Sequence, residues 1–345
     1  MMTEVRSGGS VLRRSLCRSD AITPDLGDLI VHRPRKLAPP AAWRKADLAS
    51  AAGLAALLLP SWLLPEPLWT SVWRAIARIP VLRNRRGVKR NAHNIKAALG
   101  ESLGRRCAEA AACDLNAAGY ELCMQDLRGW RPGGWCPKAA LEGEHHLQSA
   151  LARKNGVILW VAPFVFNSGP TKIALHRSGH RVSHLSSPRH GFSRTRLATA
   201  FLNRVRSIPE DRYLSQRIVF DQSAPSTAMR RMMRALQAGE IVTIVASSTE
   251  GSDLIKGPVF GGRLLVAVGA PRLAALTGAP LLPVFTVRDP EIGFRTIVGA
   301  PIKIALDRSS DERCAAAVIE YLERSEPWVR KFPEQWRAWS EWRQA

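Results

Sequence analysis

Acidic residues, tyrosine and paired cysteines are all scarce in this chain of 345 residues. It has 29 Asp and Glu against 50 Lys and Arg, and the resulting net charge of +21 indicates an anionic partner: nucleic acid, an anionic bilayer or a phosphorylated substrate. The sequence has no zinc-finger spacing and no RNP-type strand, which disfavours nucleic acid. The six Cys form no C-x-x-C pair. We expect buried thiols in a reducing compartment, with no metal and no other cofactor.

Tryptophan is frequent where tyrosine is rare, with eleven Trp against three Tyr. Many of these Trp stand beside Arg or Lys, a combination that favours the membrane–water interface. The C-terminal tail from Trp328 to Arg343 is the densest example, and residues 336, 339 and 343 are expected to share one helical face. The tail is predicted either to pack against the domain or to touch a membrane surface.

Long apolar runs are missing, with one exception. Leu48 to Leu64 carries no charge but is interrupted by Pro60, and its 17 residues are short for a bilayer span. Arg44-Lys45 precede it and the basic segment Arg83 to Arg90 follows. We predict a monotopic or barely spanning anchor over residues 41–82, in preference to a buried core helix.

The composition divides the remaining chain into three parts. Residues 1–40 mix Arg, Ser, Gly and Pro without periodicity, which predicts a disordered basic N-terminus and no secretory signal. Residues 83–136 show helical spacing and predict a helical region. Residues 137–345 are predicted to form an α/β domain that ends in the basic, Trp-rich tail.

The α/β prediction depends on short apolar runs, each preceded by a helical stretch that ends near a Gly. A helix, a Gly and a buried strand, repeated, predict a largely parallel sheet flanked by helices. The expected strands begin at Val157, Arg181, Ile241 and Leu281.

A polar turn follows the third of these strands. Ser248-Thr249-Glu250-Gly251-Ser252 would lie at the carboxyl end of the strand, the usual edge for sites in open α/β sheets. Small residues there can direct backbone N–H groups at an anion, and Lys256 adds a cation nearby. An ordinary polar loop is the alternative interpretation.

Six segments together carry a likeness to a known family. In order and spacing they resemble the lysophospholipid acyltransferase superfamily and, within it, the lipid A late acyltransferases of the lauroyl/myristoyl type. No single motif is highly specific, and the likeness extends over about residues 45–343. The segments are Asn91-Ala92-His93-Asn94-Ile95, Leu141-Glu142-Gly143-Glu144, Gly156-Val157-Ile158-Leu159, Glu250-Gly251-Ser252 with Lys256-Gly257-Pro258-Val259-Phe260, Ala279-Pro280-Leu281-Leu282-Pro283-Val284-Phe285, and Phe332-Pro333-Glu334-Gln335-Trp336.

The resemblance implies transfer of a fatty acyl group from acyl carrier protein or acyl-CoA to a hydroxyl of a phosphorylated glycolipid or lysolipid. It also implies a place at the cytoplasmic face of the inner membrane, on an anionic surface. By the same resemblance, the residues that hold the acceptor are Arg189, Glu250, Gly251, Ser252 and Lys256.

The sequence departs from the family at the catalytic position. The family has a His that acts as general base and an acid that orients it. Alignment without gaps places Pro163 and Ser168 at these positions, and a one-residue shift places Phe164 and Gly169 there. Neither alignment supplies an imidazole or a carboxylate.

Two functions follow from this departure. The chain is an acyltransferase, for which His190 at the end of the second strand is a candidate substitute base. Alternatively, it is a catalytically dead relative that binds lipid or glycolipid as a scaffold in envelope lipid or polysaccharide assembly. We predict that acyl transfer by the usual His–acid pair does not operate here.

Overall fold

The computed structural model describes residues 29–32, 40–79, 85–103, 107–187, 190–220, 225–247, 251 and 253–344. Most of the segment predicted to be disordered, residues 1–40, lies outside these ranges, as do Arg189, Glu250 and Ser252.

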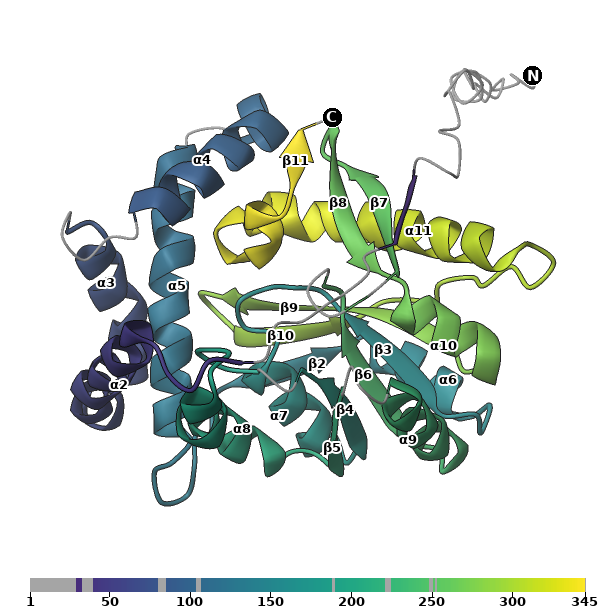
Figure 1. Cartoon of the computed structure of the whole chain (residues 1–345), viewed down its shortest axis with the longest axis horizontal. Coiled ribbons are helices and arrows are strands. Elements are labelled where there is room, and N and C mark those ends of the chain that lie inside the picture. Colours follow the sequence, from purple (N-terminus) through teal and green to yellow (C-terminus); the bar gives the residue numbers. More distant parts are fainter. Residues whose placement is uncertain are drawn as a thin grey trace, which may run out of the picture.

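The centre of the fold is a seven-stranded sheet in the order β2-β10-β9-β3-β6-β4-β5 (Figure 1). The five strands from β9 to β5 run parallel, whereas β10 is antiparallel to β9 and parallel to β2. The prediction of a largely parallel sheet is therefore confirmed. The strands are β2 (Ala139–Glu142), β3 (Val157–Val161), β4 (Val182–Ser186), β5 (Gln216–Val219), β6 (Ile241–Val245), β9 (Leu281–Asp289) and β10 (Gly293–Val298).

Helices cover both faces of this sheet, which is why β3 is apolar along its whole length. Leu159 shares a buried cluster with Leu147 of one helix and Leu175 of another. On the opposite face, the ring of Trp160 lies 4.4 Å from that of Tyr321. The covering helices are α6 (Glu144–Leu151), α7 (Gly169–Arg177), α8 (Arg204–Asp211), α9 (Pro225–Gln237), α10 (Gly269–Thr277) and α11 (Ser310–Lys331), with the π-helical turn η2 (Ala198–Leu202) before α8.

The turn into β3 requires glycine at position 156. Gly156 has φ +63°, and a Cβ there would lie 2.7 Å from the backbone of Leu236 and 2.8 Å from the carbonyl oxygen of Glu240. Any side chain would push α9 away from the sheet, so this Gly fixes how closely helix and strand approach.

A second, antiparallel sheet in the order β1-β7-β8-β11 lies beside α11. It brings residues from both ends of the chain together, because β1 pairs with β7 and β11 pairs with β8. The sequence pattern did not predict this sheet. Its strands are β1 (Ile30–His32), β7 (Asp253–Val259), β8 (Gly262–Ala267) and β11 (Arg343–Gln344).

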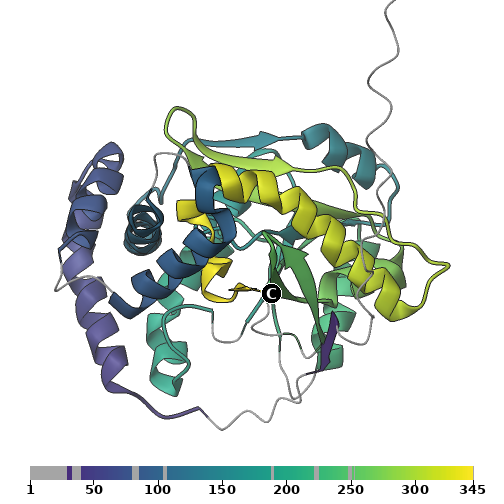
Figure 2. The ribbon, with the colours of Figure 1, turned by 90° about the horizontal axis from the view of Figure 1, so that it is seen from above.

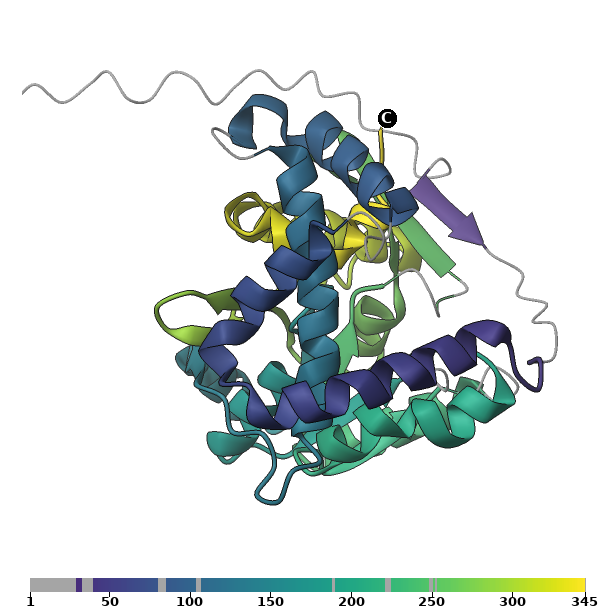
Figure 3. The ribbon, with the colours of Figure 1, turned by 90° about the vertical axis from the view of Figure 1, so that its left-hand side faces the viewer.

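The N-terminal helices gather around α5, on one side of the domain (Figures 1 and 3). Trp69 and Trp73 are buried between α3 and α5, where Trp73 stacks on Tyr120 at 5.0 Å. The region predicted to be helical, residues 83–136, contains α4 and α5. The elements are α2 (Lys45–Leu63), α3 (Glu66–Ala77), α4 (Arg85–Leu99), the 3-10 turn η1 (Gly100–Leu103) and α5 (Ala108–Arg128).

The Trp-rich tail packs inside the domain. Trp336, Trp339 and Trp342 are at most 1% exposed, and the indole N–H of Trp339 donates to the Pro333 carbonyl at 2.7 Å. The predicted single helical face was wrong, because α11 ends at Lys331 and two 3-10 turns follow, η3 (Pro333–Gln335) and η4 (Arg337–Ser340). Figure 2 shows this yellow segment beside α4. The packing alternative is thus the one that the fold adopts.

Candidate functional site

The loop after β3, residues 163–168, contains Pro163 and Ser168, the positions at which the sequence resemblance leads us to expect a catalytic pair. The C-terminal tail holds this loop through the backbone. Val165 N–H donates to the Gln335 carbonyl at 2.8 Å, and Arg337 N–H donates to the Pro163 carbonyl at 2.9 Å. The loop is therefore well braced, but the Pro163 ring offers no group that can accept a proton.

Ser168 connects this loop to a buried carboxylate. Its hydroxyl donates a short hydrogen bond to Glu210 of α8. Glu210 is 4% exposed and also accepts from Lys172 Nζ at 2.7 Å and from the Arg217 guanidinium at 2.9 Å. A carboxylate is thus present beside the aligned acid position, but it comes from another helix.

His190 completes the cluster. Its Nε2 lies 3.2 Å from Glu210 Oε2, and its side chain is 25% exposed where that of Glu210 is 4% exposed. Among the described residues, none hydrogen-bonds to the second ring nitrogen, Nδ1. His190 is therefore a partly accessible imidazole with a buried carboxylate behind it.

The loop that carries His190 is fixed by Asn203. The Asn203 side-chain oxygen accepts from Phe192 N–H at 2.7 Å, and its amide donates to the Ser193 carbonyl at 2.9 Å. Gly191 has φ +146°, and a Cβ there would collide with the Asn203 side chain. These contacts hold His190 at a defined distance from Glu210.

The charges in the cluster set the protonation states. Burial acts to raise the pKa of Glu210, but Lys172, His190 and Arg217 outweigh it and hold that pKa well below 4.5. Burial lowers the pKa of His190 below 6.5, and Glu210 opposes this only in part. His190 is therefore neutral at pH 7, with Nε2–H directed at Glu210 and Nδ1 able to accept a proton.

A second imidazole lies deeper in the same cluster. His184 Nδ1 is 2.9 Å from the Thr243 hydroxyl, and the His184 and His190 rings are 6.3 Å apart. Burial lowers the pKa of His184 well below 6.5, and Lys172 adds to that shift. His184 is only 6% exposed and is therefore a neutral, buried imidazole next to His190.

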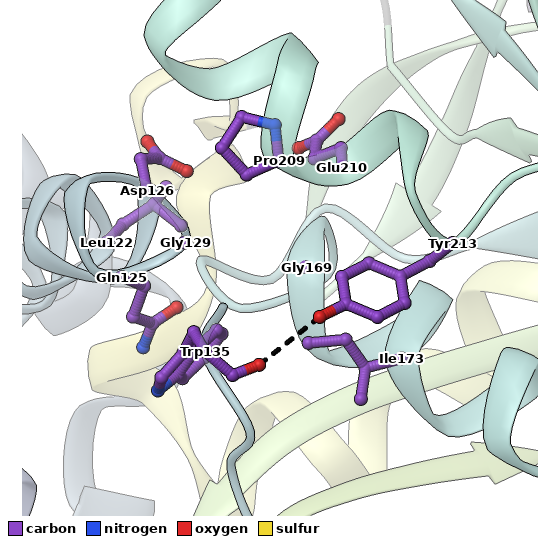
Figure 4. A pocket seen from close by; sticks show the side chains of 10 residues that line it. All are labelled: Leu122, Gln125, Asp126, Gly129, Trp135, Gly169, Ile173, Pro209, Glu210 and Tyr213. Carbon is purple, nitrogen blue, oxygen red and sulfur yellow. Dashed lines mark hydrogen bonds between the residues drawn. The ribbon is translucent and has the colours of Figure 1, made fainter. Parts of the chain in front are cut away.

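Two cavities adjoin these residues. The smaller cavity, about 30 Å³, has room for only one or two waters. Its lining includes Gln125, Trp135 and Tyr213, and the Tyr213 hydroxyl donates to the Trp135 carbonyl at 3.3 Å (Figure 4). The larger, about 360 Å³, lies between α4, α5 and η4, and Val165 of the loop after β3 contributes to its wall. Only the larger cavity can admit part of a substrate.

The residues expected to hold the acceptor are only partly described. Gly251 precedes β7 and lies close to Ala267, the last residue of β8. Lys256 lies within β7 opposite Leu265, in the second sheet rather than the first. Arg189, Glu250 and Ser252 lie outside the described residues. That these residues together hold the acceptor stays a prediction.

An exposed apolar surface lies on the side of α2 that faces away from α5. Leu59, Leu63 and Phe201 are 68%, 77% and 68% exposed. Figure 3 shows α2 alongside η2 and α8, and backbone hydrogen bonds from Arg196 and Leu197 to the carbonyls of residues 41 and 42 tie the two segments together. We call this the α2–η2 surface. Its exposed apolar and basic side chains are Trp43, Arg44, Lys45, Leu48, Leu59, Leu63, Arg194, Arg196, Leu197, Phe201 and Arg204.

The α2 helix is docked on the domain along its other side. The Thr195 hydroxyl donates to buried Asp47 at 2.7 Å, the Trp62 indole to the Leu127 carbonyl at 3.1 Å, and Arg128 to the Leu64 carbonyl at 2.6 Å. In the described part of the chain, α2 is the one helix long and apolar enough to cross a membrane, and 17% of that window is buried. These contacts are those of a helix that lies along the domain.

The sequence model of the bacterial lipid A biosynthesis acyltransferase family matches residues 48–341. The chain belongs to this family. A search among curated proteins finds no match. Family membership implies an acyl donor and a lipid acceptor, and together with α2 it is consistent with association with a membrane.

In this lipid A-type acyltransferase, sequence reasoning missed most of the charged cluster. Pro163, Ser168 and His190 were singled out from motif positions and strand ends. Glu210, Lys172 and Arg217 were not, because they belong to α8, α7 and β5 and no short spacing connects them. Pro209, which lies inside α8 next to Glu210, is a local feature that could have drawn attention to this helix.

Proposed function

We propose that the chain transfers a fatty acyl group from acyl carrier protein or acyl-CoA to a hydroxyl of a phosphorylated glycolipid or lysolipid, with His190 as general base. The observation that supports this most directly is the contact of His190 Nε2 with Glu210 at 3.2 Å. It restores the imidazole–carboxylate pair that Pro163 and Ser168 lack, using residues from two other segments.

The reaction follows the usual logic of an oriented base. His190 Nδ1 accepts the proton of the acceptor hydroxyl while its oxygen attacks the thioester carbonyl of the donor. Glu210 stabilises the imidazolium that forms. Collapse of the tetrahedral intermediate breaks the carbon–sulfur bond, and the departing thiolate takes the proton back from His190. The products are the ester and a free thiol.

Lys172 is a poorer candidate for the base. Burial lowers its pKa, but its ammonium is 3% exposed and ion-paired with Glu210 at 2.7 Å. A substrate hydroxyl could reach it only if the ion pair opened. Of the described titratable groups in this cluster, His190 has the most exposed side chain.

Replacing His190 by Ala tests the assignment. Removing a positioned general base costs about 10²–10⁴-fold in rate, so His190→Ala should lose that much transfer with purified full-length protein and a panel of acyl donors. His176→Ala, which removes an exposed imidazole from the end of α7, serves as the matched control and should leave the rate unchanged.

The pH profile supplies an independent readout. Because burial lowers the pKa of His190 below 6.5, protonation should abolish transfer only in acid, and the rate should be level at neutral pH. Any residual rate in His190→Ala should lack this acid limb. Transfer that is unaffected by His190→Ala would remove the assignment.

A non-catalytic lipid-binding function is the second candidate, and the specific observation in its favour is the Pro163 and Ser168 pair. Binding of a lipid acceptor without donor-dependent transfer, across the whole donor panel, would select this function. Pro163→Ala should have little effect under either proposal.

The place of the protein is proposed to be the cytoplasmic face of the inner membrane. The α2–η2 surface combines apolar side chains with Arg44, Lys45 and Arg204, and anionic lipids attract such a combination at about 1 kcal/mol per near-surface charge. The docking of α2 on α5 favours a helix that lies in the interface over one that spans the bilayer.

A further inference from the structure

The larger cavity is a built polar site that the mechanism above does not use. Its volume of about 360 Å³ is within the roughly 300–1,000 Å³ of small-molecule sites. Three Arg residues line it from three elements: Arg90 of α4, Arg206 of α8 and Arg337 of η4. No described residue that lines it is acidic.

The three Arg side chains differ in their hydrogen bonds and ion pairs. Arg206 is buried and ion-paired with Asp126 at 2.8 Å. Within the described part of the chain, no hydrogen bond or ion pair is made by the guanidinium of Arg90 or of Arg337. The charge of Arg206 repels the Arg337 guanidinium, whereas Glu341, which does not line the cavity, attracts it. The cavity is therefore lined by more positive than negative charge, and its two exposed Arg residues, Arg90 and Arg337, can bind an anion.

Two amide groups in the wall also lack partners. Asn91 Oδ1 and Asn116 Nδ2 are buried from solvent, and neither has a hydrogen-bond partner among the described residues. Each such group costs free energy unless something binds it. The Asn116 amide and the guanidinium groups require an acceptor, whereas the Asn91 oxygen requires a donor such as a hydroxyl.

The cavity adjoins the segments that carry the proposed chemistry. Val165 of the loop after β3 forms part of its wall. The Arg206 guanidinium lies 5.0 Å from the centre of the Phe192 ring, two residues beyond His190. A group held in the cavity is thus linked through Arg206 to the loop that positions His190.

We propose that this cavity binds a phosphate monoester that carries a neighbouring hydroxyl, as in a sugar phosphate. Arg90 and Arg337 bind the phosphate, Asn116 donates to it, and Asn91 accepts from the hydroxyl. The role as acceptor subsite rests on the proposed acyl transfer, but the binding itself does not. The same chemistry is present in the phosphopantetheine arm of an acyl donor, so the experiment separates the two sources.

Calorimetric titration of detergent-solubilised full-length protein tests this site. N-acetylglucosamine 1-phosphate should bind saturably, and N-acetylglucosamine without phosphate should not. The Arg90→Gln/Arg337→Gln variant should weaken binding at least tenfold, because it removes two charged donors of hydrogen bonds to the phosphate. The control Arg153→Gln/Arg234→Gln removes the same charge from exposed positions elsewhere and should bind as the wild type does.

Two further variants keep the test independent of folding defects. Asn116→Asp is nearly isosteric and places a negative charge in the cavity, so it should abolish binding of N-acetylglucosamine 1-phosphate. Asn91→Leu should remove the preference for this ligand over inorganic phosphate while leaving inorganic phosphate bound. Unchanged affinity in both Arg90→Gln/Arg337→Gln and Asn116→Asp, or equal binding of the sugar without phosphate, would overturn the proposal.

Two further measurements determine whether the bound phosphate belongs to the acceptor or to the acyl donor, and separate phosphate binding from acyl transfer. If 4′-phosphopantetheine binds tighter than the sugar phosphate and is weakened equally by Arg90→Gln/Arg337→Gln, the phosphate site is upheld and serves the donor. His190→Ala should bind the sugar phosphate as the wild type does, even where it loses transfer. If acyl transfer depends on His190 but the protein binds no phosphate probe, the proposed phosphate site is wrong and the proposed reaction still stands.

Discussion

Glu210 is the residue on which the charged cluster depends. Its carboxylate accepts from Ser168, Lys172, Arg217 and His190, which uses the full acceptor capacity of two oxygens. A buried carboxylate is tolerated only with such partners. In return, it allows two cations and a neutral imidazole to lie together in the interior.

Glu210→Gln should therefore be severely destabilising. It leaves Lys172 and Arg217 buried without a counter-charge, and breaking a buried ion pair costs about 3–5 kcal/mol. Ser168→Ala removes one neutral donor and should cost on the order of 1 kcal/mol. The free energies of unfolding from urea titrations would check both values. A Glu210→Gln protein as stable as Ser168→Ala would show that the ion pairs of Glu210 contribute little to stability.

At the scale of elements, the C-terminal tail acts as a brace for the loop after β3. Gln335 accepts the N–H of Arg288 at 2.7 Å and donates to the carbonyl of the same residue at 2.9 Å, as a neighbouring strand would. Its own carbonyl accepts from Val165 N–H. The Phe332-Pro333-Glu334-Gln335-Trp336 segment thus has a clear structural role next to the candidate site.

Gln335→Ala should loosen this brace. It removes the partner of the part-buried backbone N–H and C=O of Arg288, which costs about 1–3 kcal/mol. Hydrogen exchange should speed up at Arg288 and Val165 while β4 and β5 remain protected. Gln344→Ala, an exposed Gln in β11, is the control and should leave the exchange pattern unchanged. Equal exchange at Val165 in both variants would argue against a bracing role.

The elements also show what the sequence could predict. Short runs that follow a Gly located β3, β4, β6 and β9. In β3, β6 and β9 the run is mostly apolar, as expected of strands buried on both faces, whereas β4 has only Val182 and Leu185 as apolar residues. β7 escaped prediction since Gly257 and Pro258 interrupt it, and both residues argue against a strand. The fold needs that Gly, because a Cβ there would collide with Leu322 of α11.

The candidate site divides in the same way. Positions that follow strands, such as Pro163, Ser168 and His190, could be named from the order of the motifs. Their charged and hydrogen-bonding partners, such as Glu210, come into contact only when α7, α8 and β5 pack together. Likewise, the cavity is lined by Arg90, Arg206 and Arg337, which span well over two hundred residues of sequence. No periodicity in the sequence predicts that these residues lie close together.

For the whole molecule, the net charge of +21 and the α2–η2 surface together indicate an anionic membrane as the support on which the site works. Deletion of the N-terminal 80 residues is a poor test of this. It would strip Trp69 and Trp73 from α5 and expose the apolar groove that they fill. Surface substitutions separate membrane contact from folding.

Leu59→Ser/Phe201→Ser should weaken binding to phosphatidylglycerol-containing vesicles at least tenfold. Both side chains are 68% exposed, so the fold loses little, whereas burying such side chains in lipid contributes about 1.5–3 kcal/mol each. Leu276→Ser/Leu306→Ser changes side chains that are 67% and 66% exposed on other parts of the surface and provides the matched control. Cosedimentation with vesicles measures the effect, and high salt should reduce binding of all variants because the basic side chains also contribute. Equal weakening of vesicle binding by both pairs of substitutions would show that the α2–η2 surface is not the membrane contact. If every variant is released from native membranes only by detergent and never by salt, α2 spans the bilayer instead.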